Sequence, residues 1–300
     1  MPVVHTYYYT DPICPWSWAL EPAWRKLAFE FGGSLSVTYV MCGMARVLGD
    51  TTPLVSEMLE ASAQSGMPLD ARMWLAGAPR SSHPACLAVI AAAEQGDPAP
   101  YLRRLREGLL CRRRKLDTAD ALIEEARGVS GLDVERLRVA LGSHAILEAF
   151  GGDLERCGAV PAEHHSPGTG RVSLPSLEFR GSEGAVHGVY GFCDYGALRA
   201  AAVAAGASAA GAFGSGGSAG ASASPGSAAS PGSAGASASG SAGPPSIEDA
   251  LRRFGTMATA EVAAVCDLPG PRAPAELWRL ALEWRVRAER VGTGYLWSLA

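Results

Sequence analysis

The chain has 300 residues, 48% of them hydrophobic and 19% charged, which is enough apolar material for one medium-sized domain and a smaller one. Its net charge of −4 and pI near 5.9 exclude the positive field of a typical nucleic-acid-binding or membrane-surface protein. No apolar run reaches membrane-spanning length and no signal peptide is evident, so we expect a cytoplasmic protein without membrane or nucleic-acid partners.

The most informative stretch lies near the N-terminus. Residues 3–10 are β-branched and aromatic and predict a strand, a turn follows at Asp11, and apolar residues recur at helical spacing over residues 17–31. Cys14 therefore falls at or just before a helix N-terminus, where unpaired N–H groups and the helix dipole favour a thiolate. We expect a lowered pKa for Cys14. Pro15 suits the first helical turn, because it has no N–H to leave unpaired.

A second cysteine follows the next predicted strand. Residues 35–41 predict a strand parallel to the first, and Cys42 comes directly after it. Ligands of open α/β sheets bind beside the carboxyl ends of strands, so Cys42 could face Cys14 as a resolving thiol or contact a small thiol. The alternative is a loop cysteine packed against the core. The seven cysteines form no Cys-x-x-Cys pair, so we expect mostly reduced thiols and no metal site.

The middle of the chain predicts helices. Residues 54–157 carry helical periodicity with breaks at glycine and proline, which indicates an all-helical insertion spanning about residues 45–160. His83 begins one of these helices. The segment that follows predicts two antiparallel strands and a covering helix, at residues 176–179, 185–190 and 195–205.

The C-terminal quarter predicts a linker and a second module. Residues 206–246 consist almost entirely of Ala, Gly, Ser and Pro, which predicts a flexible, disordered linker. Residues 247–300 predict three helices and then a β-hairpin, the order of a winged helix. Acidic and basic residues balance in this module, so we expect it to bind a protein partner or form a homodimer rather than bind DNA.

In this order the features resemble a known family. The strand, Cys-Pro-Trp-Ser turn and helix at residues 3–31 are similar to the DsbA-like branch of the thioredoxin superfamily, in particular cytoplasmic members akin to FrnE and to 2-hydroxychromene-2-carboxylate isomerase. Segments 81–85, 172–179 and 186–191 resemble the start of that family's helical insertion, its cis-proline strand and its closing strand. The resemblance covers residues 1–205 and implies an α/β thioredoxin-like fold with a helical insertion.

The resemblance also implies roles for individual residues. Cys14 is the expected nucleophile, and Pro175 is the expected cis-proline, whose neighbouring backbone forms an extended substrate edge. His83 begins a helix that approaches the cleft in the family, where it could stabilise the Cys14 thiolate or polarise a substrate carbonyl; the alternative is a capping or surface histidine. The expected substrate contacts are Pro15, Trp16, Leu174, Cys42 and His83.

One departure from the dithiol members matters for function. The second motif position is Ser17, which can cap the helix or hydrogen-bond the Cys14 sulfur but cannot resolve a mixed disulfide. The leading hypothesis is therefore monothiol exchange with a thiol-containing protein or a small-thiol adduct. The first alternative is a glutathione-type isomerase or transferase, in which Ser17 activates the small thiol. The second is a non-catalytic adaptor. No cofactor is expected beyond a low-molecular-weight thiol that could act as co-substrate.

Overall fold

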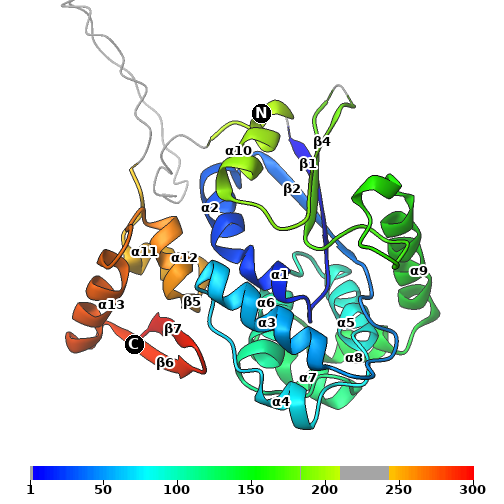
Figure 1. Ribbon diagram of the computed structural model, residues 1–300, viewed down its shortest axis with the longest axis horizontal. Coiled ribbons are helices and arrows are strands. Elements are labelled where there is room, and N and C mark those ends of the chain that lie inside the picture. Colours follow the sequence, from blue (N-terminus) through cyan, green and yellow to red (C-terminus); the bar gives the residue numbers. More distant parts are fainter. Residues whose placement is uncertain (1–2, 183, 210–242) are drawn as a thin grey trace, which may run out of the picture.

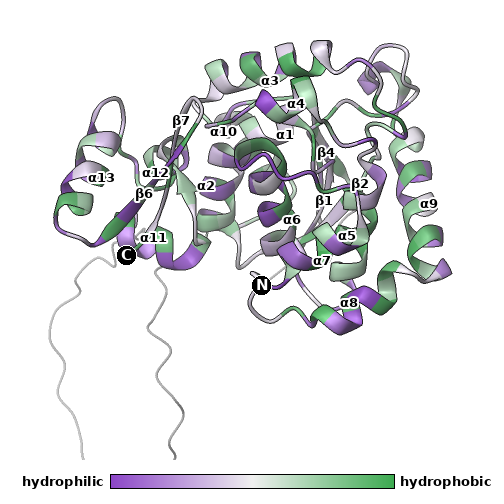
Figure 2. Cartoon of the chain, turned by 90° about the horizontal axis from the view of Figure 1, so that it is seen from below, coloured by the Kyte–Doolittle hydropathy of each residue, from purple (hydrophilic) through white to green (hydrophobic). Residues whose placement is uncertain are grey.

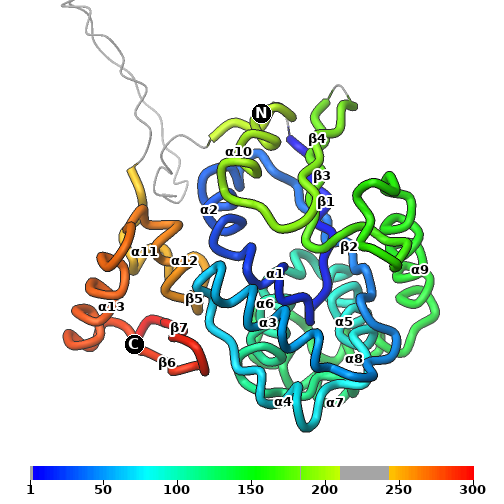
Figure 3. The backbone as a smooth tube through the Cα atoms, in the orientation of Figure 1, coloured from blue at the N-terminus to red at the C-terminus, as the bar shows by residue number. Residues whose placement is uncertain are grey.

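The computed structural model describes residues 3–182, 184–209 and 243–300. Within this part of the chain, the N-terminal domain is built on a sheet of four strands: β1 (Val4–Thr10), β2 (Leu35–Met41), β3 (Ser176–Arg180) and β4 (Val186–Tyr190). Their order is β2-β1-β3-β4, with β1 and β2 parallel and the other pairs antiparallel (Figures 1 and 3). This is the α/β thioredoxin-like arrangement predicted from the sequence.

Helices cover both faces of the sheet because side chains of β1 alternate between them. Tyr8 points to the face covered by α2 (Glu21–Phe31) and α10 (Tyr195–Ala204), and packs with Trp24 at a ring-centroid distance of 5.2 Å. Tyr9 points to the opposite face, where it joins a smaller apolar cluster that includes Cys157 of α9 (His144–Ala159). Both tyrosine side chains are buried.

The first helix is shorter than the sequence predicts. The periodic stretch divides into α1 (Pro15–Ala19) and α2, which meet at Leu20. Pro22 has no N–H to donate to the Trp18 carbonyl, which is the bond that a continuous helix would require there. The consequence is that only a five-residue helix follows Cys14 directly.

An all-helical insertion separates β2 from β3. Its core includes Leu102, Leu105, Leu109 and Leu110, which are all buried, as their spacing predicts. Figure 2 shows hydrophobic and hydrophilic residues together on helices such as α8 and α9. The elements are α3 (Thr52–Ser65), α4 (Arg72–Ala76), α5 (His83–Ala93), α6 (Ala99–Arg106), a π-helical turn (Glu107–Cys111), α7 (Ala119–Ala126), α8 (Val134–Leu141), α9 and a 3₁₀ turn (Ala162–His164).

The C-terminal module contains the predicted helices and hairpin. A strand that the sequence analysis missed, β5, pairs with β7, so the described sheet has the order β5-β7-β6. Whether the module is a true winged helix stays a prediction, and most of the predicted linker lies outside the described residues. The elements are α11 (Ile247–Phe254), β5 (Met257–Ala258), α12 (Thr259–Val265), α13 (Arg272–Leu282), β6 (Val286–Val291) and β7 (Gly294–Leu299).

The module packs against the N-terminal domain at two places. Helix α12 lies against α2 (Figure 1), and the β6–β7 turn reaches the insertion. There the Thr293 N–H donates to the Leu69 carbonyl at 3.2 Å, and a Cβ on Gly292 would lie only 2.2 Å from the same oxygen. Position 292 in this turn therefore accepts only glycine, which has no side chain. None of the described helices is both long and apolar enough to cross a membrane.

Candidate functional site

Cys14 caps the N-terminus of α1, directly after β1. The Ser17 backbone N–H donates to the Cys14 sulfur at 3.3 Å, which is the capping contact expected of this position. The Ser17 side chain faces the interior instead, where its Oγ accepts a hydrogen bond from the Thr10 hydroxyl at 2.8 Å. Ser17 thus supports the sulfur through its backbone, while its hydroxyl is fully buried.

The loop that carries Cys14 is held by Asp11, which the sequence analysis used only as a turn signal. Asp11 Oδ1 accepts from the Ile13 N–H at 2.9 Å. Its Oδ2 accepts from the Met44 N–H at 2.6 Å and from the Ser82 hydroxyl at 2.8 Å. A single buried carboxylate therefore joins the Cys14 loop to the loop after β2 and to the start of α5.

A cavity of about 470 Å³ opens beside Cys14 and is called here the Cys14 cavity. It combines four of the predicted site residues, Cys14, Trp16, Cys42 and Leu174. Its remaining lining residues come from α3, the loop after β2 and the segment before β3, and are Met44, Glu57, Ser166, Pro167, Thr169, Arg171 and Val172.

The remaining predicted site residues do not line this cavity. Pro15 occupies the first position of α1, and both Pro15 and Ser17 are buried. The His83 ring packs edge-on against Phe150, with ring centroids 5.0 Å apart, and burial lowers its pKa. Ser17 is not placed to activate a small thiol in the cavity, so the isomerase alternative receives no support from the geometry.

The sulfur itself differs from the sequence prediction. Burial raises the pKa of Cys14 above its ordinary value, because desolvation outweighs hydrogen bonding from Ser17, and the Asp11 carboxylate adds to the increase. Only 2% of Cys14 is exposed. The prediction of a lowered pKa assumed a long helix with an accessible N-terminus, whereas α1 has five residues and its first turn is covered. At neutral pH the resting form is therefore the thiol.

Cys42 also differs from the prediction of a free thiol. It forms a disulfide with Cys157 of α9, with a Cα–Cα distance of 6.0 Å. No sequence pattern indicated this pair, because the two residues are 115 positions apart and meet only when α9 packs on β2. The other cysteines, all within the described residues, are unpaired, as expected: Cys14, Cys86, Cys111, Cys193 and Cys266.

The segment before β3 also lines the cavity. The Leu174–Pro175 peptide bond is cis, as the sequence predicted. Arg171, which the sequence analysis did not single out, donates to the Cys42 carbonyl at 2.8 Å and to the Met44 carbonyl at 3.3 Å. The Arg171 side chain therefore connects the segment before β3 to the loop after β2.

A second group of polar residues lies beneath Cys14. Arg106 of α6 is buried and donates through its two terminal nitrogens to the Thr10 hydroxyl and to the Glu21 carboxylate. Thr10 in turn donates to Ser17, so hydrogen bonds connect Arg106 to the turn that caps the Cys14 sulfur. Although burial opposes ionisation of Glu21, the neighbouring arginines, Arg106 first, hold its pKa below the usual value.

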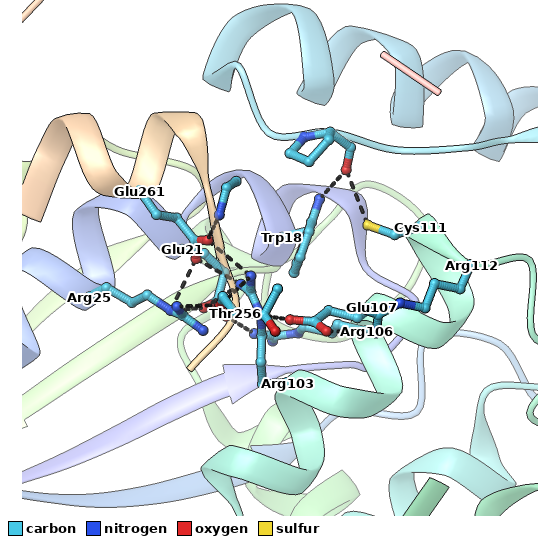
Figure 4. Close-up of polar contacts among 12 residues, drawn as sticks. Trp18, Glu21, Arg25, Arg103, Arg106, Glu107, Cys111, Arg112, Thr256 and Glu261 are labelled. Carbon is cyan, nitrogen blue, oxygen red and sulfur yellow. Dashed lines mark hydrogen bonds and ion pairs between the residues drawn. The ribbon is translucent and has the colours of Figure 1, made fainter. Parts of the chain in front are cut away.

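The same group reaches the C-terminal module (Figure 4). Arg103 donates to both carboxylate oxygens of Glu261, at 2.7 and 2.9 Å, and to Glu21 at 3.3 Å. Arg25 contacts the same Glu261 at 3.0 Å and donates to the Thr256 carbonyl at 3.0 Å. Glu261 is fully buried, and these two arginines compensate its charge. Sequence patterns could not find this network, because its members come from three separate helices.

The family of this chain follows from its similarity to known proteins. A family model described as thioredoxin matches residues 7–159, which is half of the chain. The chain belongs to the thioredoxin family. Its thioredoxin domain is also similar in structure to a candidate protein disulfide isomerase from Nitrosomonas europaea, with a TM-score of 0.58 and 16% identity over 67% of this chain and 97% of that one. A candidate DsbA oxidoreductase from Streptomyces coelicolor matches at a TM-score of 0.50, with 17% identity over 67% and 89%. These likenesses confirm the DsbA-like fold.

Curated relatives carry a different description. A protein from Halalkalibacterium halodurans called ClpXP adapter protein SpxH is 30% identical over 161 residues, 50% of this chain. The chain spans about half the length of that relative, 52%, and the same share of a Bacillus subtilis protein of that name. A third SpxH, from Shouchella clausii, is 26% identical over 97% of this chain and 87% of its own length. The match to the Shouchella clausii protein extends beyond the thioredoxin domain into the C-terminal module.

Proposed function

We propose that the protein is an adaptor that presents another protein to a ClpXP-type protease. The observation that carries this proposal is the match to the Shouchella clausii ClpXP adapter protein SpxH, which covers 97% of the chain and so includes both modules. A catalytic oxidoreductase would be expected to match mainly over its thioredoxin domain. The proposal places the protein in the cytoplasm, with a protein partner.

The state of Cys14 supports the same proposal. Its pKa is raised, its side chain is almost fully buried, and the second motif position holds Ser17. A dithiol oxidase needs an accessible thiolate and a second motif thiol to release its substrate. In an adaptor the thioredoxin fold needs neither, because it serves as a scaffold for binding.

The C-terminal module offers a surface that suits protein binding. Leu282 at the end of α13 is 82% exposed and Trp284, two residues later, is 87% exposed. Burying such exposed apolar side chains in an interface favours binding, and tryptophan is among the residues enriched at interface centres. We assign the partner contact of the proposed adaptor to this end of α13.

Protein lifetimes test the adaptor proposal. In the source organism, half-lives would be measured by pulse labelling and mass spectrometry in strains lacking this protein, lacking ClpX, and lacking both. We expect at least one protein whose half-life lengthens to the same extent in all three strains, because an adaptor and its protease act in one pathway. Additive lengthening in the double deletion, or no protein stabilised in both single deletions, would contradict the proposal.

A second candidate function is thiol exchange at Cys14, which the Cys14 cavity favours. The cavity has room for a small thiol or an extended peptide, and it is lined by both Cys14 and Leu174, the residue before the cis-proline. In this function Cys14 is the nucleophile, the Ser17 N–H supports the sulfur and the backbone beside Pro175 is the substrate edge. The raised pKa makes such exchange slow at neutral pH and faster in alkaline solution.

A further inference from the structure

The Cys14 cavity has three cysteines at or behind its wall, and only Cys14 belongs to the sequence motif. Cys14 and Cys42 both line the cavity, and Cys42 is bonded to Cys157 behind it. The backbone explains why they meet. Strands β1 and β2 pair in parallel up to Thr10 and Met41, and the Cys42 N–H donates to the Thr10 carbonyl at 2.9 Å. The two cysteines thus follow the adjacent ends of neighbouring strands.

We propose that the Cys42–Cys157 pair is the redox partner of Cys14, so that three cysteines together do what a Cys-x-x-Cys pair does elsewhere. In the exchange step the Cys14 thiol loses its proton to solvent in the cavity, and its sulfur attacks the Cys42 sulfur. The Cys14–Cys42 bond forms, the Cys42–Cys157 bond breaks, and Cys157 leaves with the electron pair and takes up a proton. Thiols and disulfides balance, and no further oxidant is needed.

The lining of the cavity sets the direction of attack in this proposal. Cys42 and Cys157 are both buried in the same apolar cluster, but only Cys42 lines the cavity together with Cys14. Cys42 is therefore the sulfur that we expect Cys14 to attack. Cys157 is the leaving thiol in one direction and the attacking thiol in the other.

The reverse direction defines a substrate class, which is a small or peptide disulfide. Cys14 attacks the substrate disulfide, forms a mixed disulfide and releases one thiol. Cys42 of the reduced pair then displaces the second substrate thiol from Cys14, and Cys157 displaces Cys14 from Cys42. The net reaction reduces one substrate disulfide to two thiols and restores the Cys42–Cys157 bond. This proposal rests on thiol exchange at Cys14, and not on the adaptor function.

The test follows formation of the Cys42–Cys157 bond. The full chain would be reduced, freed of reductant and mixed with oxidised glutathione, and samples would be quenched in acid, alkylated and mapped by peptide mass. The unaltered protein, Cys14→Ser and Cys193→Ser would be compared. Cys193 is a matched control, because it is an unpaired, more exposed cysteine that packs on the opposite face of the sheet. We expect at least a tenfold slower bond formation in Cys14→Ser and a rate within twofold of the unaltered protein in Cys193→Ser.

Two further variants separate this proposal from the thiol-exchange function on which it rests. Cys157→Ser is expected to accumulate a Cys14–Cys42 disulfide, and Cys42→Ser a lasting glutathione adduct on Cys14. If Cys42→Ser carries the adduct but Cys157→Ser forms no Cys14–Cys42 bond, the three-cysteine proposal is wrong and thiol exchange stands. If no adduct forms on Cys14, thiol exchange itself is wrong. Should either variant fail to fold, an equal rate in Cys14→Ser and the unaltered protein still overturns the proposal.

Discussion

The reactivity of Cys14 is decided by its surroundings and not by the motif that contains it. The capping N–H of Ser17 favours the thiolate, but burial and the Asp11 carboxylate oppose it, and burial is the larger influence. A cysteine at the same motif position on a long, open helix would carry the opposite shift. The motif alone therefore gives the place of the sulfur and leaves its ionisation undetermined.

The first prediction concerns the alkylation rate of Cys14. We expect the rate with iodoacetamide to rise through the alkaline range, with an apparent pKa above that of Cys14 in the urea-unfolded chain, because the folded environment disfavours the thiolate. The measurement is peptide-resolved alkylation as a function of pH, with the unfolded chain as the control. A Cys14 that is half ionised below pH 7.5 would contradict the burial that the structure assigns to it.

The second prediction concerns Asp153 of α9, whose carboxylate accepts a hydrogen bond from the Met41 N–H at 2.8 Å. Burial raises the pKa of Asp153 from 3.8 to about 6, because desolvation outweighs that hydrogen bond and the nearby Arg156. Between these two pH values the folded chain binds more protons than the unfolded chain does. The stability contributed by this group is therefore complete below its unfolded pKa and is lost as the pH rises through 6.

The corresponding variant is Asp153→Asn, which keeps an oxygen acceptor for the Met41 N–H. At pH 7.5 we expect it to raise the free energy of unfolding, by no more than about 3 kcal/mol, since a pKa unit corresponds to about 1.36 kcal/mol. Near pH 4 the advantage should disappear. Urea unfolding of both proteins at the two pH values measures this difference. If the substitution lowers the free energy of unfolding more at pH 7.5 than at pH 4, the raised pKa of Asp153 is wrong.

Among the elements, α13 joins a buried face to an exposed end. Its Leu277 and Leu280 are buried in the core of the C-terminal module, while Leu282 and Trp284 face solvent. Trp284 has a φ of 59°, a conformation that is uncommon for a residue with a large side chain. The chain turns sharply there into β6, and the indole is displayed at the turn.

The third prediction tests this end of α13 as the partner contact. The double variant Leu282→Ser/Trp284→Asn should keep the stability of the unaltered protein, because both side chains are exposed and asparagine tolerates a positive φ. It should weaken partner binding at least tenfold. The measurement is the half-life of the proposed client in cells, which should lengthen because less client reaches the protease. Leu75→Ser is the matched control, because Leu75 on α4 is 66% exposed but lies elsewhere. Equal effects of both variants would argue against a contact at α13.

In the whole molecule, buried ion pairs connect the C-terminal module to the thioredoxin domain. Glu261 is shared between Arg103 of the insertion and Arg25 of α2, and Arg103 also contacts Glu21, which Arg106 connects to the Cys14 region. A buried ion network is costly to assemble but strongly destabilising when one member is lost. The two modules should therefore unfold together.

The fourth prediction is that Glu261→Gln destabilises the protein by about 3–5 kcal/mol, because two arginines lose the carboxylate that compensates their burial. The measurement is urea unfolding, together with hydrogen exchange of α12, which should be faster in the variant. Glu276→Gln is the control, since the Glu276 side chain is 46% exposed and its pair with Arg279 should be worth at most about 1 kcal/mol. Similar losses in both variants would show that Glu261 does not fasten the module.

The sequence by itself determined much of the architecture. Strand and helix periodicity located β1, β2, β6 and α11 to within one residue, and the family resemblance identified the cis-proline. These features are local, because they depend on the spacing of apolar residues and on turn chemistry within a few positions. The same is true of the place of Cys14 at a helix start.

Only the tertiary structure decided the ionisation of Cys14, the pairing of Cys42 with Cys157 and the network around Glu261. Each depends on groups brought together from distant parts of the chain: Cys14 with Arg106, α9 with β2, and α12 with α2 and α6. Burial and charge compensation are properties of such assembled surroundings, and no pattern along the sequence encodes them directly.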